Sequence, residues 1–327
     1  TAVTSGSGSV TFDKTAPTLI SVAIASDNTT TTLAKVDDVV TLTFTASETI
    51  QTPVVTFTSG SAAVTDASIT YTNTSGNTWT AAYTANSSDT EGTVAYSIAF
   101  TDSVGNAGTA VTSGSGSVTF DKTAPTITSI TSTTNDGTYN TDDTVNVTVT
   151  FSEAVTLAGG NLVVTLETGT NDRTVTITSV SGSNTASGTY TVQAGDTSSD
   201  LTASGIALSG GSLSDAAGNA MSSFAIGSNL AASSALVIDT TPATVTNVTS
   251  TTDNGSYKAT DVISIQVTFS EVMTVSGTPQ LTLETGANDA VVDYDDGSGS
   301  NTLTFTYTVG AGQTSSDLDY ASTGALA

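Results

Sequence analysis

The sequence predicts an all-β chain built from consecutive Greek-key β-sandwich domains. Short apolar runs alternate with polar residues, as in "VNVTVTFSE" (145–153) and "NTLTFTYTV" (301–309). Threonine and other β-branched residues on a period of two are typical of strands with one buried face. Apolar residues with helical spacing do not persist long enough anywhere to predict a helix. Recurring motifs at intervals of about one sandwich domain complete the prediction.

The recurring motif begins at an aspartate. Asp13 of "FDKTAPT" recurs as Asp121 after 108 residues, and as Asp239 of "IDTTPAT" after a further 118. An apolar run and an acidic loop follow each aspartate, and then a strand that ends in Ser-Glu. These strands are "TLTFTASE" (41–48), "VTVTFSE" (147–153) and "IQVTFSE" (265–271). Three domains therefore share one plan.

The motif also sets the expected domain boundaries. We expect domains at 14–121, 122–239 and 240–327, the last of them incomplete and without its final strands. Residues 1–18 are identical to residues 109–126, so residues 1–13 are expected to be the last strand of a preceding domain. An extended strand over residues 1–12, paired outside the first complete domain, is the corresponding structural expectation.

The middle domain can be divided into seven expected strands, separated by Gly, Asn and Asp turns. The first begins near Thr126, and the last precedes Asp239. Between them we expect strands at 144–151, 161–168, 174–180, 187–192 and 206–213. Seven short strands of this kind are typical of a Greek-key sandwich.

Charge and composition exclude several classes of function. The chain has 5 Lys and Arg against 30 Asp and Glu, a formal net charge of −25. This balance opposes binding to nucleic acids and anionic membranes and favours cations as partners. The chain has no Cys and no His, which excludes Ser-His-Asp and Cys-His catalysis and thiolate metal sites. We therefore expect no enzymatic activity.

The segment "FTDSVGNAGTAVTSGSGSVTFDKTAPT" (100–126) resembles the D-x-x-G-N … D-x-T-A-P signature of tandem bacterial immunoglobulin-like (Ig-like) repeats in giant surface adhesins. "VTFSE" resembles a second subgroup of such repeats. The resemblance implies Ig-like domains arranged end to end in a long extracellular stalk, commonly stiffened by calcium at the domain junctions. "IDTTPAT" departs from the Thr-Ala-Pro order of the signature.

Topology alone predicts where the carboxylates gather. In such a sandwich the linker Asp, the Glu that ends the second strand and the loop before the last strand share one pole, while two other acidic loops lie at the opposite pole, facing the next domain. The first set comprises Asp13, Glu48, Asp102 and Asn106, then Asp121, Glu153, Asp215 and Asn219, then Asp239 and Glu271. The facing set comprises Asp27 and Asp89, with Asp37 and Asp38, in the first domain and Asp136 and Asp200, with Asn135, Asp142 and Asp143, in the second.

Such clusters predict structural calcium sites at the junctions. Crowded carboxylates repel one another unless a cation neutralises them. Ca²⁺ accepts six to eight oxygen ligands, whereas Zn²⁺ prefers nitrogen and sulfur. A second interpretation stays open, because Asp-x-x-Gly-Asn is also favourable turn chemistry without any metal.

The predicted function is a structural spacer of an extracellular bacterial surface fibre or adhesin. Its partners would be neighbouring repeats of the same or another chain, and no nucleic acid or membrane insertion is expected. One alternative is a filament subunit, in which the N-terminal strand of one chain completes the last domain of another. A second alternative, an accessory region of a polysaccharide-degrading enzyme, would need an exposed aromatic face.

Overall fold

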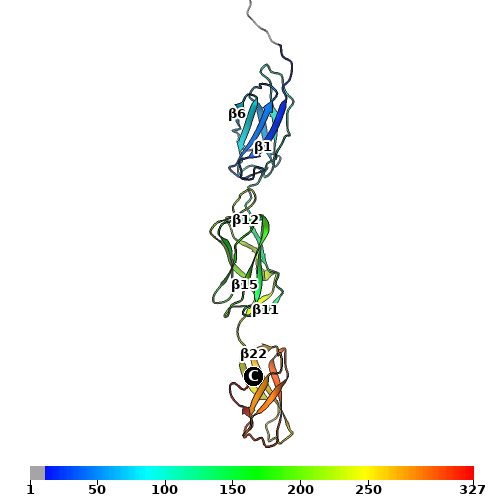
Figure 1. The fold of residues 1–327 in the computed structure, drawn as a ribbon, viewed down its shortest axis with the longest axis vertical. Helices are drawn as coiled ribbons and strands as arrows, with labels where there is room; N and C mark the ends of the chain where they lie inside the picture. The colour runs from blue at the N-terminus through cyan, green and yellow to red at the C-terminus, as the bar shows by residue number, and fades with distance from the viewer. Residues whose placement is uncertain (1–11) are drawn as a thin grey trace, which may run out of the picture. The chain divides into compact units, whose positions relative to one another are not determined.

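The computed structural model describes residues 12–327 and confirms an all-β chain. The chain divides into two units, Thr1–Thr240 and Thr241–Ala327. Figure 1 shows the strands of the first unit in blue to green and those of the second in yellow to red. Among residues 12–327, no helix is long and apolar enough to cross a bilayer. The strand expected over residues 1–12 lies outside the described residues, except for its last position.

Residues 19–120 form two sheets whose strand order is that of an Ig-like sandwich. The first sheet contains, in order, β1 (Leu19–Ser26), β3 (Val39–Ala46), β7 (Thr78–Thr84) and β6 (Thr70–Ser75). The second contains β2 (Leu33–Ala34), β9 (Thr119–Phe120), β8 (Gly92–Ala99), β4 (Val54–Ser59) and β5 (Ala62–Ala63). All pairs are antiparallel except β2 with β9, which is parallel. We call this part domain 1.

Residues 127–239, called domain 2, repeat the plan with more strands. One sheet contains β15 (Ser183–Thr191), β12 (Thr144–Ala158), β10 (Ile127–Thr131) and β19 (Ile226–Ser228), and β18 (Ser212–Ser214) pairs with the end of β12. A second contains β11 (Gly137–Tyr139), β20 (Leu236–Asp239) and β16 (Thr197–Ser198), and a third contains β14 (Arg173–Ile177), β13 (Asn161–Leu166) and β17 (Ala203–Ser209). A short 3-10 helix, η1 (Leu230–Ala232), begins at Asn229, whose side chain accepts a hydrogen bond from the Leu230 amide.

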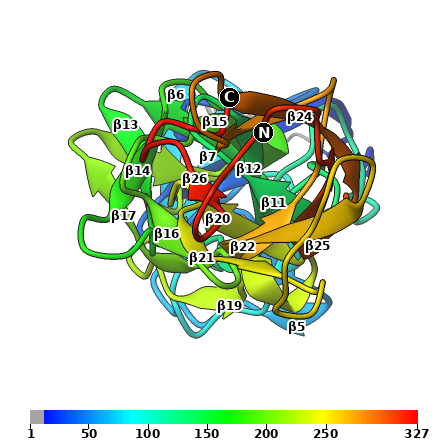
Figure 2. The same ribbon diagram turned by 90° about the horizontal axis from the view of Figure 1, so that it is seen from below.

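The second unit, residues 241–327, is called domain 3. Its strands follow one continuous path, because residues 290–293 of β24 pair with β23 and Tyr294 and Asp296 pair with β25. In order they are β21 (Val245–Ser250), β22 (Val262–Met273), β25 (Ser300–Thr308), β24 (Ala290–Asp296), β23 (Gln280–Glu284) and β26 (Asp319–Tyr320). Figure 2 shows β22 and β25 side by side, as their antiparallel register requires.

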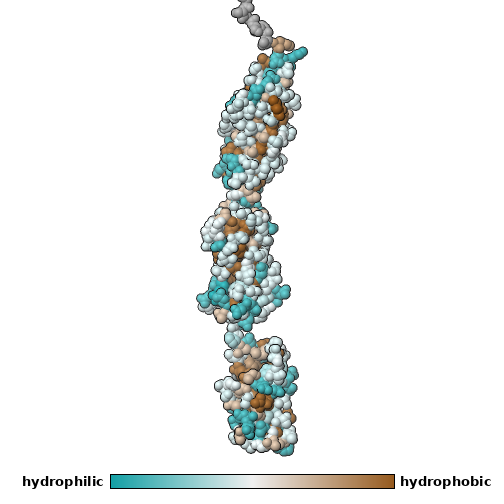
Figure 3. All heavy atoms as spheres, viewed as in Figure 1, coloured by the Kyte–Doolittle hydropathy of each residue, from teal (hydrophilic) through white to brown (hydrophobic). Residues whose placement is uncertain are grey.

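Each domain encloses its own hydrophobic core between its sheets. The cores lie within residues 24–120, 127–238 and 263–325. Phe44, Leu162 and Phe305 are fully buried in them. Burying a side chain of this size contributes about 1.5–3 kcal/mol to stability. On the visible face in Figure 3, hydrophobic residues form small separate patches on a surface that is mostly of intermediate hydropathy.

Two strands of domain 2 differ from the sequence-based expectation. The strand expected at 144–151 continues through Glu153 to Ala158. After a register shift it pairs again with β15 at Val155, and its last three residues pair with β18. The strand expected at 206–213 is divided into β17 and β18, which pair with β13 and with the end of β12. Alternation of apolar and polar residues gives the face of a strand but not its partner.

The glycines of "SGSGS" (113–117) allow the last segment of domain 1 to lie against β1. Ser115 donates from its amide to the Val22 carbonyl and accepts from the Ile24 amide, at 2.9 and 3.1 Å. Gly116 adopts a φ of +76°, and a Cβ there would lie 2.3 Å from the Ile24 carbonyl oxygen. Only glycine permits this approach.

Candidate metal sites

Two groups of three carboxylates occupy equivalent positions in domains 1 and 2. Site 1 consists of Asp13, Glu48 and Asp102, and site 2 consists of Asp121, Glu153 and Asp215. In each group, one carboxylate oxygen from every residue lies within 4.8 Å of the others. Both groups join the linker Asp, the Glu of the Ser-Glu motif and the Asp of Asp-x-x-Gly-Asn. The convergence expected from topology is therefore present twice.

A serine next to the glutamate aligns the first two members of each group. In domain 1, the Ser47 amide donates to the Thr18 carbonyl at 2.8 Å, and the Ser47 hydroxyl accepts from the Thr18 amide at 3.0 Å. Ser152 and Thr126 make the same pair of bonds in domain 2, at 2.9 and 3.0 Å. These two hydrogen bonds join the start of the domain to the end of the Ser-Glu strand. They bring the glutamate beside the linker aspartate.

The Asp-x-x-Gly-Asn loop supplies the third carboxylate and is tied to the linker by its asparagine. In domain 2, the Asn219 amide group donates to Asp215 Oδ2 at 2.8 Å and to the Asp121 carbonyl at 3.1 Å. Asn106 makes the equivalent bonds in domain 1, to Asp102 Oδ2 at 2.7 Å and to the Asp13 carbonyl at 3.3 Å. The two asparagines therefore hold the loop and do not need to be ligands.

Asp102 also performs the turn role expected of this motif. Its Oδ1 accepts from the backbone amides of Val104, Gly105 and Asn106, at 2.9, 2.7 and 2.8 Å. Burial raises the pKa of Asp102, but the hydrogen bonds from Asn106 and the backbone outweigh burial and leave the pKa below its ordinary value. Asp102 therefore both stabilises the turn and belongs to site 1.

Site 2 is electrostatically crowded. Burial raises the pKa of Asp121, and the charges of Asp215 and Glu91 add to this rise. Burial also raises the pKa of Glu153, followed by the charges of Asp215, Asp121 and Glu91. The raised pKa means that burial and neighbouring charges destabilise the ionised carboxylate. A bound cation would offset this destabilisation.

Glu91 is a member of this neighbourhood that the sequence did not indicate. It belongs to the domain 1 loop before β8, and its Oε1 accepts from the Lys122 amide at 2.9 Å and from the Thr123 hydroxyl at 2.6 Å. The hydrogen bonds from Thr123 and Lys122 lower the pKa of Glu91, so it stays ionised next to Asp121. Domain 1 therefore places a further negative charge near site 2, outside the group of three carboxylates.

The residues expected to face the next domain lie outside both sites. Asp27 accepts from the Val39 amide at 2.8 Å, and Asp136 accepts from the Ala235 amide at 2.8 Å. Asp89 is buried and accepts from Thr65 and Asn86, and Asp200 is exposed. Each of the three hydrogen-bonded residues is occupied by contacts within its own domain.

Asp196, not Asp200, occupies the place in domain 2 that Asp89 holds in domain 1. Asp196 is buried and accepts from Arg173 Nε at 2.8 Å, the Tyr190 hydroxyl at 2.7 Å and the Gln193 amide at 3.0 Å. Burial raises its pKa, but these bonds and the Arg173 charge outweigh burial and lower it. Gln313 takes the same place in domain 3, where its Oε1 accepts from the Tyr307 hydroxyl at 2.8 Å. In domains 2 and 3 this residue directly precedes "TSSD", as Asp196 and as Gln313. This recurrence is the signal in the sequence that indicates a structural role.

Asp239 belongs to the first unit and Glu271 to the second, so a site that joins them stays a prediction. Both side chains are half-buried.

The domain 2 loop that carries Asp215 also touches domain 1. Asn28 donates from its side-chain amide to the Ala217 carbonyl at 2.9 Å and to Asp38 Oδ2 at 2.7 Å. Lys35 pairs with the other oxygen of Asp38, at 2.9 Å. Ala217 is only 3% exposed. The loop that supplies a carboxylate to site 2 is therefore also an interdomain contact.

Comparison with known proteins gives structural likeness only. No protein-family model and no curated protein matches the chain. A titin I-band fragment, I67–I69, is 9% identical, with 91% of this chain and 90% of that chain covered and a TM-score of 0.34. A Ca²⁺-stabilized adhesin of an Antarctic bacterium, described as helping it to reach out and bind ice, is 20% identical, with 89% and 66% covered and a TM-score of 0.35. A tetra-tandem repeat from the extending region of a large adhesion protein is also 20% identical, with 89% and 66% covered and a TM-score of 0.33. Tandem Ig-like domains and adhesin repeats are both among the similar structures.

Proposed function

We propose that this chain is a structural segment of an extracellular bacterial surface adhesin and that calcium at its domain junctions stiffens it. The observation that carries the proposal is the recurrence of the same three-carboxylate group at sites 1 and 2. A turn alone needs one Asp, whereas a hard cation needs several oxygens in one place. The raised pKa values of Asp121 and Glu153 support a site that gains stability when a cation neutralises it.

Calcium suits these groups better than other common ions. All donors available at the sites are oxygen atoms, and the chain has no Cys or His to hold zinc. Extracellular calcium modules bind with dissociation constants of about 10⁻⁴–10⁻³ M, so calcium outside the cell would keep them occupied. Because Glu91 and the Asn28 contact come from domain 1, occupation of site 2 would fix domain 2 against domain 1. A non-catalytic spacer needs this property.

Calcium titration by isothermal calorimetry tests the proposal. The Asp121→Asn, Glu153→Gln double variant removes two carboxylates of site 2, whereas Asp172→Asn, Glu167→Gln removes two exposed carboxylates outside both sites and outside the acidic loops expected to face the next domain. The charge change is identical in the two variants. We expect the first variant to lose one binding event and the second to bind like the wild type. Equal loss in both variants, or no binding by the wild type, would leave these carboxylates as ordinary surface and turn groups.

A further inference from the structure

The first residues of the linker after domain 1 are bonded to domain 1 itself. The Asp121 amide donates to the Ala34 carbonyl at 2.9 Å. The Lys122 ammonium donates to the Ser87 carbonyl at 2.8 Å and to the Asp89 carbonyl at 2.7 Å. Hydrogen bonds with a charged donor are roughly twice as strong as those between neutral groups. Lys122 therefore attaches the linker to the loop between β7 and β8.

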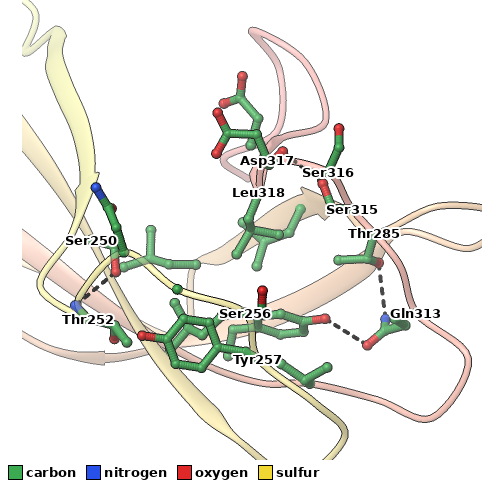
Figure 4. Close-up of a pocket in the computed structure, with 18 of the residues that line it drawn as sticks. Ser250, Thr252, Ser256, Tyr257, Thr285, Gln313, Ser315, Ser316, Asp317 and Leu318 are labelled. Atoms are coloured by element: carbon green, nitrogen blue, oxygen red, sulfur yellow. Dashed lines mark hydrogen bonds between the residues drawn. The ribbon is translucent and has the colours of Figure 1, made fainter.

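The loop that receives Lys122 contains a turn that recurs in all three domains. In each domain, an Asp or Gln side chain accepts a hydrogen bond from the backbone amide three residues earlier: Asn86 donates to Asp89 at 2.9 Å, Gln193 to Asp196 at 3.0 Å and Gly310 to Gln313 at 2.7 Å. Figure 4 shows Gln313 in domain 3, where its amide group also donates to the Thr285 hydroxyl at 3.1 Å. These bonds fix the turn and orient its carbonyl groups.

The linker after domain 2 is attached to the equivalent turn by a different side chain. The residue directly after the linker aspartate is Lys122 in one linker and Thr240 in the other. The Thr240 hydroxyl donates to the Asp196 carbonyl at 2.9 Å and accepts from the Gly195 amide at 2.9 Å. Because Asp196 is the counterpart of Asp89, Lys122 and Thr240 bond to the same carbonyl of the turn. This recurrence indicates that the position after the linker aspartate serves to hold the linker.

Glu91 attaches the next residue of the first linker. Its Oε1, which accepts from the Lys122 amide and the Thr123 hydroxyl, belongs to the same loop of domain 1. The Thr123 amide donates back to Asp121 Oδ1 at 3.0 Å. Residues 121–123 are therefore joined to domain 1 along their whole length.

The start of domain 2 is fixed at Thr126. Two hydrogen bonds, described above, join Thr126 to Ser152. Ala124 and Pro125 lie between Thr123 and Thr126, and the ring of Pro125 holds its φ at about −65°. Backbone rotation that reorients domain 2 against domain 1 is therefore concentrated at Ala124 and Pro125.

We propose that residues 121–123 move with domain 1 as one rigid body, that the chain bends between domains 1 and 2 at residues 124–125, and that Lys122 is the lock that keeps the bend there. The inference does not rest on calcium, because the bonds that carry it involve no metal. It goes beyond the stalk role by locating the bend that remains when no cation is bound.

Side-chain amides span the bend. Asn219 of domain 2 donates to the Asp121 carbonyl, and Asn28 of domain 1 donates to the Ala217 carbonyl. Because the net contribution of a neutral hydrogen bond to stability is small, water can replace either of them. The lock has a charged donor and two acceptors, so it opens less readily than these contacts.

Amide hydrogen exchange at single-residue resolution, in chelator, tests the lock without involving sites 1 and 2. Lys122→Met removes two charge-assisted hydrogen bonds and is expected to lower the protection factors at positions 122 and 123 by roughly tenfold or more, while Ile98 in β8 stays protected. Lys14→Met makes the same charge change at an exposed lysine after the preceding linker aspartate and is expected to have no effect there. Unprotected amides at positions 122 and 123 of the wild type, or equal protection in the wild type and Lys122→Met, would overturn the proposal.

The second linker gives an independent test with a substitution of nearly unchanged shape. Thr240→Val removes the hydroxyl that accepts from the Gly195 amide, so the protection factor of Gly195 is expected to fall roughly threefold or more. Thr170→Val changes an exposed threonine in the same domain and serves as the control. Unchanged protection of Gly195 in Thr240→Val would contradict the role assigned to this position.

The place of the bend is tested by loosening one residue. Spin labels on Ala67→Cys and Ser199→Cys report the distance between domains 1 and 2 in chelator. Ala124→Gly is expected to broaden the distance distribution, because glycine has the greatest backbone freedom. Ala62→Gly, at an exposed position within domain 1, is expected to leave the width unchanged. No broadening by Ala124→Gly, or equal broadening by both variants, would place the bend elsewhere and overturn the proposal.

Discussion

Glu153→Gln is expected to stabilise domain 2 in the absence of calcium and to abolish its response to calcium. The carboxylate of Glu153 lies within 4.8 Å of oxygen atoms of Asp121 and Asp215. Glutamine preserves the shape of the side chain and removes its charge. The wild-type carboxyl group has a raised pKa because burial and these neighbours oppose its ionisation. Its replacement therefore removes an unfavourable interaction from the metal-free folded state.

The size of the effect follows from the separation of the charges. Two unit charges 4.8 Å apart repel by about 0.9 kcal/mol in bulk water and by about 3.5 kcal/mol at an effective dielectric constant of about 20. Glu153 is half-buried, so solvent screening favours the lower part of this range. We expect a gain of about 1–2 kcal/mol in chelator. Calcium at about ten times its dissociation constant would stabilise the wild type by about 1.4 kcal/mol, and this increment should vanish in the variant.

Amide hydrogen exchange in β10 and β12 measures this effect in domain 2 alone. Exchange is compared between wild type and Glu153→Gln, each in chelator and in calcium, at pH 7. Glu167→Gln serves as the charge control, because Glu167 is exposed and lies outside both sites. Slower exchange for Glu153→Gln in chelator, with no further change in calcium, is the expected result. An equal calcium response in the wild type and in Glu153→Gln, or faster exchange of Glu153→Gln in chelator, would contradict the predicted repulsion at site 2.

The remaining predictions concern pH, a buried carboxylate and the interdomain contact. Because the pKa values of Asp121 and Glu153 are raised in the folded state, the metal-free wild type should lose stability as the pH rises from the ordinary carboxyl pKa through the raised values; thermal melts in chelator would show this, and calcium should suppress it. Asp196→Ala should destabilise domain 2 by about 2–4 kcal/mol, measured by urea unfolding, because it leaves the buried Tyr190 hydroxyl without its partner; a cost below about 1 kcal/mol would contradict that role. Asn28→Ala should leave calcium affinity at site 2 unchanged but broaden the range of orientations between domains 1 and 2, measured by residual dipolar couplings; unchanged couplings would show that the contact does not restrain the domains.

The sequence predicted the grouping of the three carboxylates at sites 1 and 2, because local motifs fix their positions. The linker Asp, the Ser-Glu strand end and Asp-x-x-Gly-Asn each recur, and sandwich topology brings their positions to one pole. Ser152 and Asn219 then tie the three segments together through short hydrogen bonds. Each of these contacts lies within one domain and its linker, so each follows from the fold of that domain.

The contribution of the neighbouring domain was not predictable in the same way. Glu91 reaches site 2 through its bonds to the linker residues Lys122 and Thr123, and Asn28 contacts the loop of Asp215. Both depend on how two domains meet, which no repeated pattern within one domain encodes. Asp89 was expected to face site 2 from domain 1. Its buried carboxylate instead accepts hydrogen bonds from Thr65 and Asn86, so its oxygen atoms are satisfied inside its own domain.

The distance distribution between domains 1 and 2 shows directly whether calcium stiffens their junction. Spin labels on Ala67→Cys and Ser199→Cys report one distance, since the chain has no other cysteine and both positions are exposed. Double electron–electron resonance is recorded in calcium and in chelator. For the wild type, a narrow distribution is expected in calcium and a broader one in chelator. For Asp121→Asn, Glu153→Gln, the distribution should be broad under both conditions. A wild-type distribution of the same width with and without calcium would contradict this expectation.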